Sequence, residues 1–151
     1  VSLRRSLAPD ASRFGGLTKL RGTRGLVEFI QATLAPMRLK AGIWVAAYIR
    51  RCGVEGVFAA VRRRGAEEAG AIYVIVNRLD GTADLYGPAP QAAFDDAHPS
   101  DRAFTPLLKT LPAPESAVES YIARESKFDP DIWVIEIEER SGRHFLDRIV
   151  R

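Results

Sequence analysis

The fold is decided by residues 128–138, FDPDIWVIEIE, which contain the clearest strand pattern of the chain. A proline disfavours helical backbone in the residue before it, so the chain is expected to be extended at Asp129-Pro130. From there the alternation places Trp133, Ile135 and Ile137 on one face. We therefore predict a strand over 132–138 and place the other elements around it.

Immediately before this strand, residues 114–127 predict a helix with one apolar face. Val118, Tyr121 and Ile122 recur at spacings of three and four residues, and Pro114 suits the first turn of a helix. This segment is the second of the two helices that we expect in the chain.

Further upstream, two extended segments over 57–64 and 71–79 predict an antiparallel pair of strands. Asp80-Gly81 is a residue pair that accepts positive φ in a tight turn, so residues 83–86 are expected to return beside the second strand. Three strands are thus predicted between the two helices.

The remaining segments complete the expected order. A helix over 42–52 precedes the strands, with Gly53 as its left-handed cap. Prolines in the sequence GPAP, residues 87–90, end the sheet, and residues 91–112 predict a long loop with one helical turn near Leu107. The fold class is therefore α+β in the order α-β-β-β-α-β, with a four-stranded, mainly antiparallel sheet and two helices on one face.

Charge and composition suggest a domain boundary near the single methionine, Met37. Residues 1–36 hold six of the 22 basic and two of the 19 acidic side chains, so the remaining chain is close to neutral. They also lack helical or alternating periodicity. We predict a disordered or mis-annotated N-terminal extension over 1–36 and a single α+β domain over 37–151. A basic arm that binds a membrane or nucleic acid is the alternative.

Composition also limits the functional classes. The longest apolar run, residues 43–49, is far shorter than the roughly 20 residues that span a bilayer, so no membrane partner is expected. The single cysteine, Cys52, excludes an internal disulfide and a multi-cysteine zinc site. We expect a cytoplasmic protein in which Cys52 is a buried, unreactive thiol on the apolar face of the first helix.

Four stretches of the chain carry a family resemblance: residues 37–45, 62–65, 85–90 and 128–138. They resemble an uncharacterised group of short alphaproteobacterial proteins, the DUF1491-like group, and the resemblance covers about 37–148. It implies no activity, ligand or cofactor, because none is established for the group.

The most enzyme-like residues are Asp131, Glu136 and Glu138, since metal-dependent hydrolases gather carboxylates around a cation. Asp131 and Glu136 are five residues apart, however, and on one strand they would point to opposite faces. Phosphate-binding glycine loops and HExxH spacing are missing from the sequence. We therefore assign no catalytic residues and no cofactor, and keep a metal-dependent hydrolase as an alternative function.

A second cluster, Asp95, Asp96 and His98, lies in the predicted loop together with Asp101. Carboxylate and imidazole groups can bind a divalent cation, although loops are rich in such residues. We retain Asp95, Asp96 and His98 as candidate binding residues and assign no metal to them. His144 is too distant in sequence to complete a zinc motif.

The strongest basic cluster is Arg62, Arg63 and Arg64. It is a candidate nucleic-acid contact, but the following helix begins with Glu115 rather than with lysines, and the expected domain is nearly neutral. Our leading hypothesis is a non-catalytic binding or protein-interaction module that uses the sheet edge and the 87–112 loop. Nucleic-acid binding through the three arginines is the weaker alternative.

Overall fold

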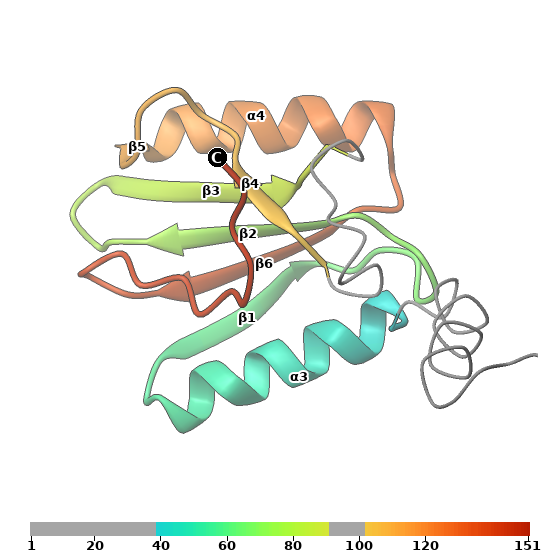
Figure 1. Ribbon diagram of the computed structural model, residues 1–151. Helices are drawn as coiled ribbons and strands as arrows, with labels where there is room; N and C mark the ends of the chain where they lie inside the picture. Colours follow the sequence, from blue (N-terminus) through green and yellow to red (C-terminus); the bar gives the residue numbers. More distant parts are fainter. Residues whose placement is uncertain (1–38, 91–101) are drawn as a thin grey trace, which may run out of the picture. The chain divides into compact units, whose positions relative to one another are not determined.

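The computed structural model describes residues 39–90 and 102–151 as two helices and a mixed sheet (Figure 1). The fold is α+β, as the sequence predicts. The two predicted helices and the four predicted strands are all present, with ends that differ by a few residues at most. Their bounds in chain order are α3 (Ala41–Val54), β1 (Phe58–Arg63), β2 (Ile72–Asn77), β3 (Thr82–Pro88), β4 (Phe104–Pro106), β5 (Ala113–Pro114), α4 (Glu115–Phe128) and β6 (Trp133–Glu138).

Strand β6 lies in the interior of the sheet, whose order is β1-β6-β2-β3-β4. It pairs antiparallel with β1 and parallel with β2. The predicted antiparallel pair of 57–64 with 71–79 is therefore wrong, because β6 lies between these two strands. In the interior of the sheet, the apolar strand β6 gains backbone hydrogen bonds and side-chain neighbours on both sides. This gain outweighs the shorter connection that a hairpin of β1 with β2 would have.

The β2–β3 hairpin is confirmed, with Val76 paired to Asp84 and Asn77 to Ala83. In its turn, Leu79 and Gly81 have positive φ values. Two short strands then share the far edge of β3, so the sheet has six strands rather than the predicted four. β4 pairs with the end of β3 and β5 with its beginning.

The predicted 91–112 loop thus contains β4 within its described part, and no helix forms at Leu107. The backbone N–H of Leu107 instead donates to the carbonyl oxygen of Leu85 at 3.1 Å. Residues 91–101 lie outside the described residues.

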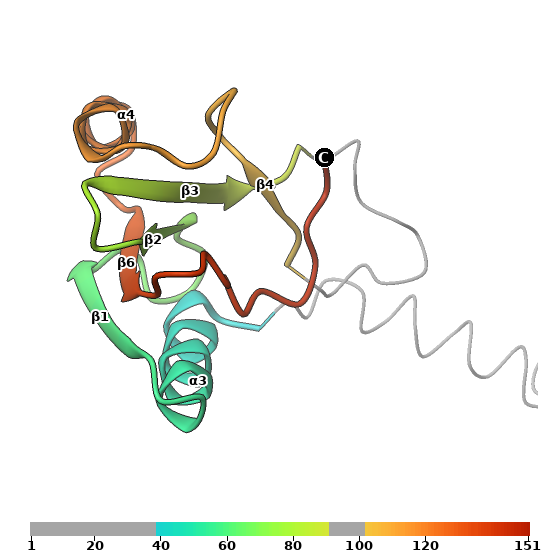
Figure 2. The ribbon, with the colours of Figure 1, turned by 90° about the vertical axis from the view of Figure 1, so that its left-hand side faces the viewer.

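The two helices pack on opposite faces of the sheet, which corrects the prediction of one shared face. Ile72, Val74 and Val76 of β2 contact the cluster of α3, whereas Tyr73 and Ile75 contact the cluster of α4. Strand β2 is buried on both faces, and a sheet with two apolar faces needs a cover on each. Figure 2 shows α3 beside β1 and α4 beside β3.

Helix α3 continues through Gly53 and ends at Val54, so Gly53 is not the left-handed cap. Gly56, with a φ of 74°, provides the positive φ after the helix. Cys52 is fully buried, as predicted, and burial raises the pKa of its thiol. Over the described residues, the helices are too short or too polar to span a bilayer.

Beside α3, the segment that follows β6 covers the same face of the sheet. Leu146 is buried in the α3 cluster, and Phe145 and Ile149 pack against it. Ile149 also forms a bridge with Phe104 of β4, so this segment contacts the β4 edge of the sheet.

Candidate functional site

Within residues 39–90 and 102–151, Asp84 is the one charged residue that is buried, with 1% of its surface exposed. It belongs to β3 and faces the same side as Tyr86, because the two are two residues apart on one strand. A buried charge is unfavourable unless it is paired, so its surroundings indicate why it is there.

The partner of Asp84 is Arg78, which directly follows β2. Both the Nε and the Nη2 of Arg78 bind the same carboxylate oxygen, Oδ2, at 2.9 and 2.8 Å. The hairpin fixes this geometry, since the backbone N–H of Arg78 donates to the carbonyl of Thr82 at 3.0 Å. The other carboxylate oxygen, Oδ1, is buried and has no hydrogen-bond partner in the described chain.

The Arg78 guanidinium also lies against Gly142, which has a φ of 80°. A side chain at this position would be strained and would collide with the guanidinium. Gly142 thus lets the segment after β6 close over the Arg78–Asp84 pair.

The pair lines a cavity of about 990 Å³ between the β3–β4 edge, the 105–111 segment and the C-terminal segment, which we call the Asp84 hollow. Three of its side chains are cationic and one is anionic, so the hollow has a surplus of positive charge. Its lining residues are Arg78, Asp84, Tyr86, Thr105, Pro106, Leu108, Lys109, Leu111, Gly142, His144, Ile149 and Arg151.

The rings of His144 and Tyr86 are inclined by 62° in an edge contact, with 5.1 Å between their centroids. Its Nδ1 accepts the backbone N–H of Leu146 at 3.0 Å, so the neutral ring carries its proton on Nε2. Burial lowers the pKa of His144; the Asp84 carboxylate opposes this shift and Arg151 adds to it. His144 is therefore neutral at pH 7 and acts as a hydrogen-bond donor through Nε2.

Helix α3 holds the segment that carries His144. The Tyr48 hydroxyl donates to the carbonyl oxygen of His144 at 2.6 Å, and Arg51 pairs with Asp147 at 2.7 Å. On the other side, the backbone N–H of Val150 donates to the carbonyl of Phe104 at 2.7 Å. These contacts fix one wall of the Asp84 hollow to two separate elements.

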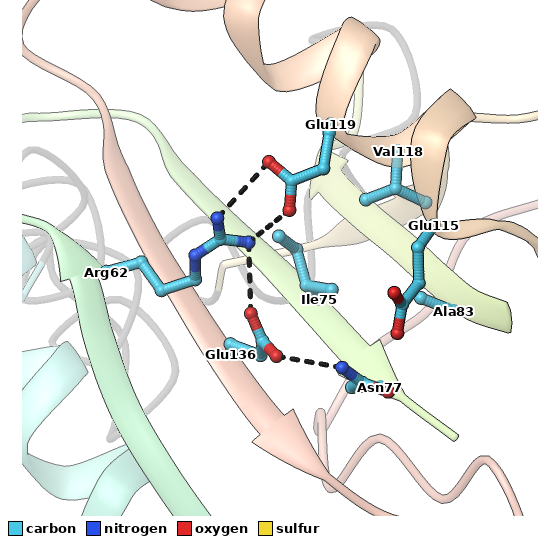
Figure 3. Close-up of a pocket in the computed structure, with 8 residues that line it drawn as sticks. All are labelled: Arg62, Ile75, Asn77, Ala83, Glu115, Val118, Glu119 and Glu136. Atoms are coloured by element: carbon cyan, nitrogen blue, oxygen red, sulfur yellow. Dashed lines mark hydrogen bonds and ion pairs between the residues drawn. The ribbon is translucent and has the colours of Figure 1, made fainter. Parts of the chain in front are cut away.

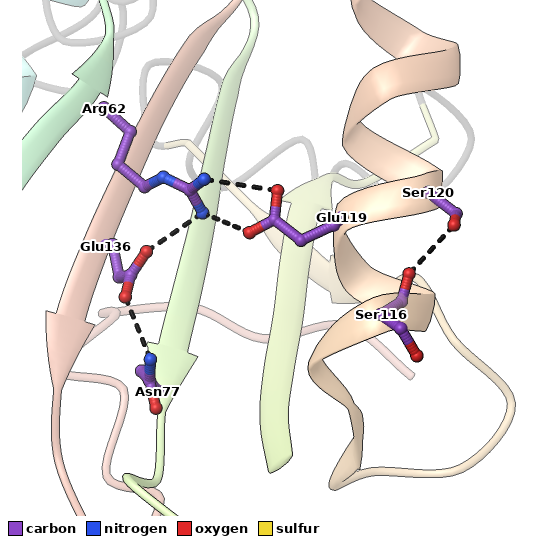
Figure 4. Close-up of polar contacts among 6 residues, drawn as sticks. All are labelled: Arg62, Asn77, Ser116, Glu119, Ser120 and Glu136. Atoms are coloured by element: carbon purple, nitrogen blue, oxygen red, sulfur yellow. Dashed lines mark hydrogen bonds and ion pairs between the residues drawn. The ribbon is translucent and has the colours of Figure 1, made fainter. Parts of the chain in front are cut away.

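The predicted site residues lie elsewhere. Arg62 is at an irregularity in the β1–β6 pairing, where the register shifts between Val61 and Arg63, and such bulges redirect a side chain. Arg62 reaches across β6 to α4, binding Glu119 at 2.6 Å and Glu136 at 3.0 Å (Figure 4). Its charge is thus engaged by the protein itself.

The other two arginines point to different partners. Arg63 donates to the backbone oxygen of Pro130 at 2.9 Å. Arg64 lies 5.7 Å from the ring centroid of Trp133 and 3.7 Å from a carboxylate oxygen of Glu67. The three neighbours in sequence do not form one basic surface, although nucleic-acid binding through them stays an untested prediction.

Asp95, Asp96 and His98 lie outside the described residues, so their role stays a prediction. Among the residues that are described, no group of three or more histidine, cysteine or acidic side chains could hold a metal ion.

A second, smaller cavity of about 360 Å³ lies between α4 and the opposite face of the sheet (Figure 3). Its charged lining residues are Arg62, Glu115, Glu119 and Glu136, which makes it acidic. Asn77 donates to Glu136 at 3.0 Å and, with Arg62, ties two of the carboxylates into an internal network. This network joins α4 to the sheet and needs no ligand to explain it.

Sequence reasoning missed the residues of the Asp84 hollow. Asp84 alternates with apolar neighbours as a solvent-facing residue would, and nothing local distinguishes it. His144 was noted only as too distant for a zinc motif. The hollow lies at the sheet edge and includes residues of the 87–112 segment, where we expect a binding surface, and this expectation stays a prediction.

Comparison with known proteins gives one family and several solved structures. The family model described as protein of unknown function (DUF1491) matches residues 39–147. A crystal structure of a DUF1491 family protein from Caulobacter crescentus is 39% identical, with a TM-score of 0.61, covering 75% of this chain and 98% of that one. A solution structure of a protein from A. tumefaciens is 40% identical, with a TM-score of 0.63, covering 76% of this chain and 97% of that one. No curated protein matches significantly.

Proposed function

Because the chain belongs to the DUF1491 family, whose function is unknown, we propose a function from its own geometry: it is a non-catalytic binding module that holds a small anionic molecule in the Asp84 hollow. The observation that carries this proposal is the buried Asp84–Arg78 pair at the wall of a cavity with surplus positive charge. Binding sites typically combine a cavity with a few polar or charged groups that converge on it.

The charge of the hollow favours an anion. Arg78, Lys109 and Arg151 all line it, while Asp84 contributes the one negative side chain. Arg78 directs Nε and Nη2 at Asp84 and is a quarter exposed, so the rest of its planar guanidinium is available to a carboxylate or phosphate.

The hollow also has an apolar side that suits the carbon part of a ligand. Leu108, Leu111 and Ile149 belong to its lining. Ligand sites typically combine such apolar walls with a few polar groups that orient the molecule.

The state of His144 supports binding rather than acid–base catalysis. Its Nδ1 lone pair is used by the N–H of Leu146, and Nε2 carries the proton. A general base needs a free lone pair near the operating pH, whereas this ring presents a donor to the hollow.

The proposal is tested by titrating inorganic phosphate and propionate into the ¹⁵N-labelled protein. We expect amide shifts at residues of the hollow, and a several-fold weaker affinity in Lys109→Ala. Lys127→Ala is the matched control, because Lys127 is an exposed lysine in the last turn of α4, outside the lining of the hollow. Equal weakening in both variants, or no binding of either anion, would contradict the proposal.

We also propose a cytoplasmic location, which the single buried free thiol of Cys52 supports. Fractionation of cells that produce the tagged protein tests it, and recovery in the periplasm would oppose it.

A further inference from the structure

We infer that the ligand of the Asp84 hollow carries a hydroxyl group beside its anionic group, and that Oδ1 of Asp84 accepts a hydrogen bond from this hydroxyl. This inference rests on the proposed function and narrows its ligand class to hydroxy acids or hydroxyalkyl phosphates.

The two oxygens of the Asp84 carboxylate differ in their hydrogen bonding. Oδ2 accepts two N–H groups from Arg78, whereas Oδ1 is buried without a partner in the described chain. An ionised carboxylate only accepts hydrogen bonds, so Oδ1 calls for a donor. Buried polar atoms in native proteins are almost always hydrogen-bonded.

The neighbouring side chains do not supply this donor. Burial and the nearby Asp84 charge both raise the pKa of Tyr86. At His144, burial lowers the pKa and the Asp84 charge partly opposes this shift. Both side chains are thus close to Asp84, yet neither forms a hydrogen bond with it. Asp84 belongs to the lining of the hollow, so we place the missing donor on a molecule bound there.

The charge balance selects a neutral donor. Arg78 already neutralises Asp84, and Lys109 and Arg151 add two further positive charges to the lining. An ammonium group near Asp84 would be repelled by Arg78, whereas a hydroxyl donates without adding charge. The cations attract the anionic group of the ligand, and the Asp84 carboxylate repels it. The hydroxyl end of the ligand therefore lies at Asp84 and the anionic end lies toward the cations.

A site of this kind distinguishes ligands with a hydroxyl from ligands without one, because its acceptor, Oδ1 of Asp84, needs a donor. A ligand without the hydroxyl would fill the hollow and leave the Asp84 oxygen without a donor, and such mismatches reduce affinity strongly. We therefore expect lactate to bind at least about tenfold more tightly than propionate, and 2-hydroxyethyl phosphate more tightly than ethyl phosphate. The two pairs separate a carboxylate from a phosphate as the preferred anion.

Asp84→Asn provides a sharp variant because it preserves shape. Arg78 has donors only, so the amide oxygen of the asparagine must face Arg78 and its NH₂ group must face the hollow. The acceptor at the wall thus becomes a donor. The hydroxyl of lactate can still accept from this amide, but it loses the charge-assisted bond to a carboxylate, so the lactate-to-propionate affinity ratio should fall several-fold below that of the wild-type protein.

The experiment measures these affinities by calorimetric titration of the full chain and of Asp84→Asn, and uses the ratio within each protein, which partial unfolding leaves unchanged. Lactate, propionate and L-alanine share one carbon skeleton. A wild-type ratio near one, with Lys109→Ala weakening both acids, would overturn the inference and leave the anion-binding function standing. Tighter binding of L-alanine than of lactate would also overturn it. If none of the anions bound, the proposed function itself would fail.

Discussion

Replacing Arg78 by alanine is expected to destabilise the protein more than replacing Asp84 by alanine. Asp84 is 1% exposed, so the loss of Arg78 leaves a buried carboxylate without its partner. Breaking a buried pair from one side costs about 3 to 5 kcal/mol, and we take about 3 kcal/mol because the cavity admits water. The side chain of Arg78 is 25% exposed and can turn to solvent, so Asp84→Ala should cost about 1 to 2 kcal/mol.

The double variant, with both Arg78→Ala and Asp84→Ala, separates the interaction energy of the pair from the effects of the two single changes. Removing both charges leaves neither of them unpaired, so we expect the double change to cost about 2 kcal/mol, well below the sum of the two single changes. Urea denaturation followed by circular dichroism gives the three unfolding free energies, with unchanged m values as the check on two-state behaviour.

The control is Lys40→Ala, which removes the exposed ion pair of Lys40 with Glu68 and should leave the unfolding free energy unchanged. An Asp84→Ala variant as unstable as Arg78→Ala, or strict additivity in the double variant, would refute the reasoning about burial.

Four further outcomes are expected. Burial lowers the pKa of His144 from its ordinary 6.5, so as the pH falls the unfolded chain binds a proton at this residue before the folded chain does. The contribution of His144 to the free energy of unfolding is therefore present above pH 6.5 and is lost as the pH drops through the lowered pKa of the folded state. His144→Gln should reduce the difference between urea midpoints at pH 7.5 and pH 5.5, and an unchanged difference would count against it. Tyr48→Phe removes the bond to the His144 carbonyl and should cost about 1 kcal/mol in the same urea assay, with no loss as the contrary result. Gly65→Ala should cost about 2 kcal/mol, because its methyl would overlap the backbone of Asp131, whereas Gly53→Ala, with open space in α3, should stabilise by about 1 kcal/mol; equal melting temperatures would contradict this contrast. We propose that 37–151 folds as one domain, so a chain that begins at Met37 should melt as cooperatively as the full chain, and a broad transition would oppose it.

Much of the local structure could be predicted from the sequence. The alternation of Trp133, Ile135 and Ile137 placed them on one face, and all three are buried in the cluster of α3. The Asp80-Gly81 pair gave the correct hairpin, although the positive φ values lie at Leu79 and Gly81 rather than at Asp80. These features depend on neighbours within a few residues, so the sequence pattern is sufficient.

The candidate site could not be predicted in the same way. Arg62 to Arg64 look like a basic patch in sequence, but Arg62 contacts α4 and β6, while Arg63 contacts Pro130. The Arg78–Asp84 pair spans one hairpin, yet its burial depends on Gly142 and His144, some 60 residues later. Whether a strand aspartate is solvated or buried is decided by what covers the strand, and that cover is distant in sequence.

The sequence by itself determined the α+β class and the place of nearly every helix and strand, because periodicity and turn residues act between close neighbours. Only the tertiary structure decided that β6 lies between β1 and β2, that the helices cover opposite faces, and that Asp84 is enclosed by the C-terminal segment. The physical reason is that strand pairing and burial are contests between distant segments for the same apolar surface, and residue spacing carries no record of which segment wins.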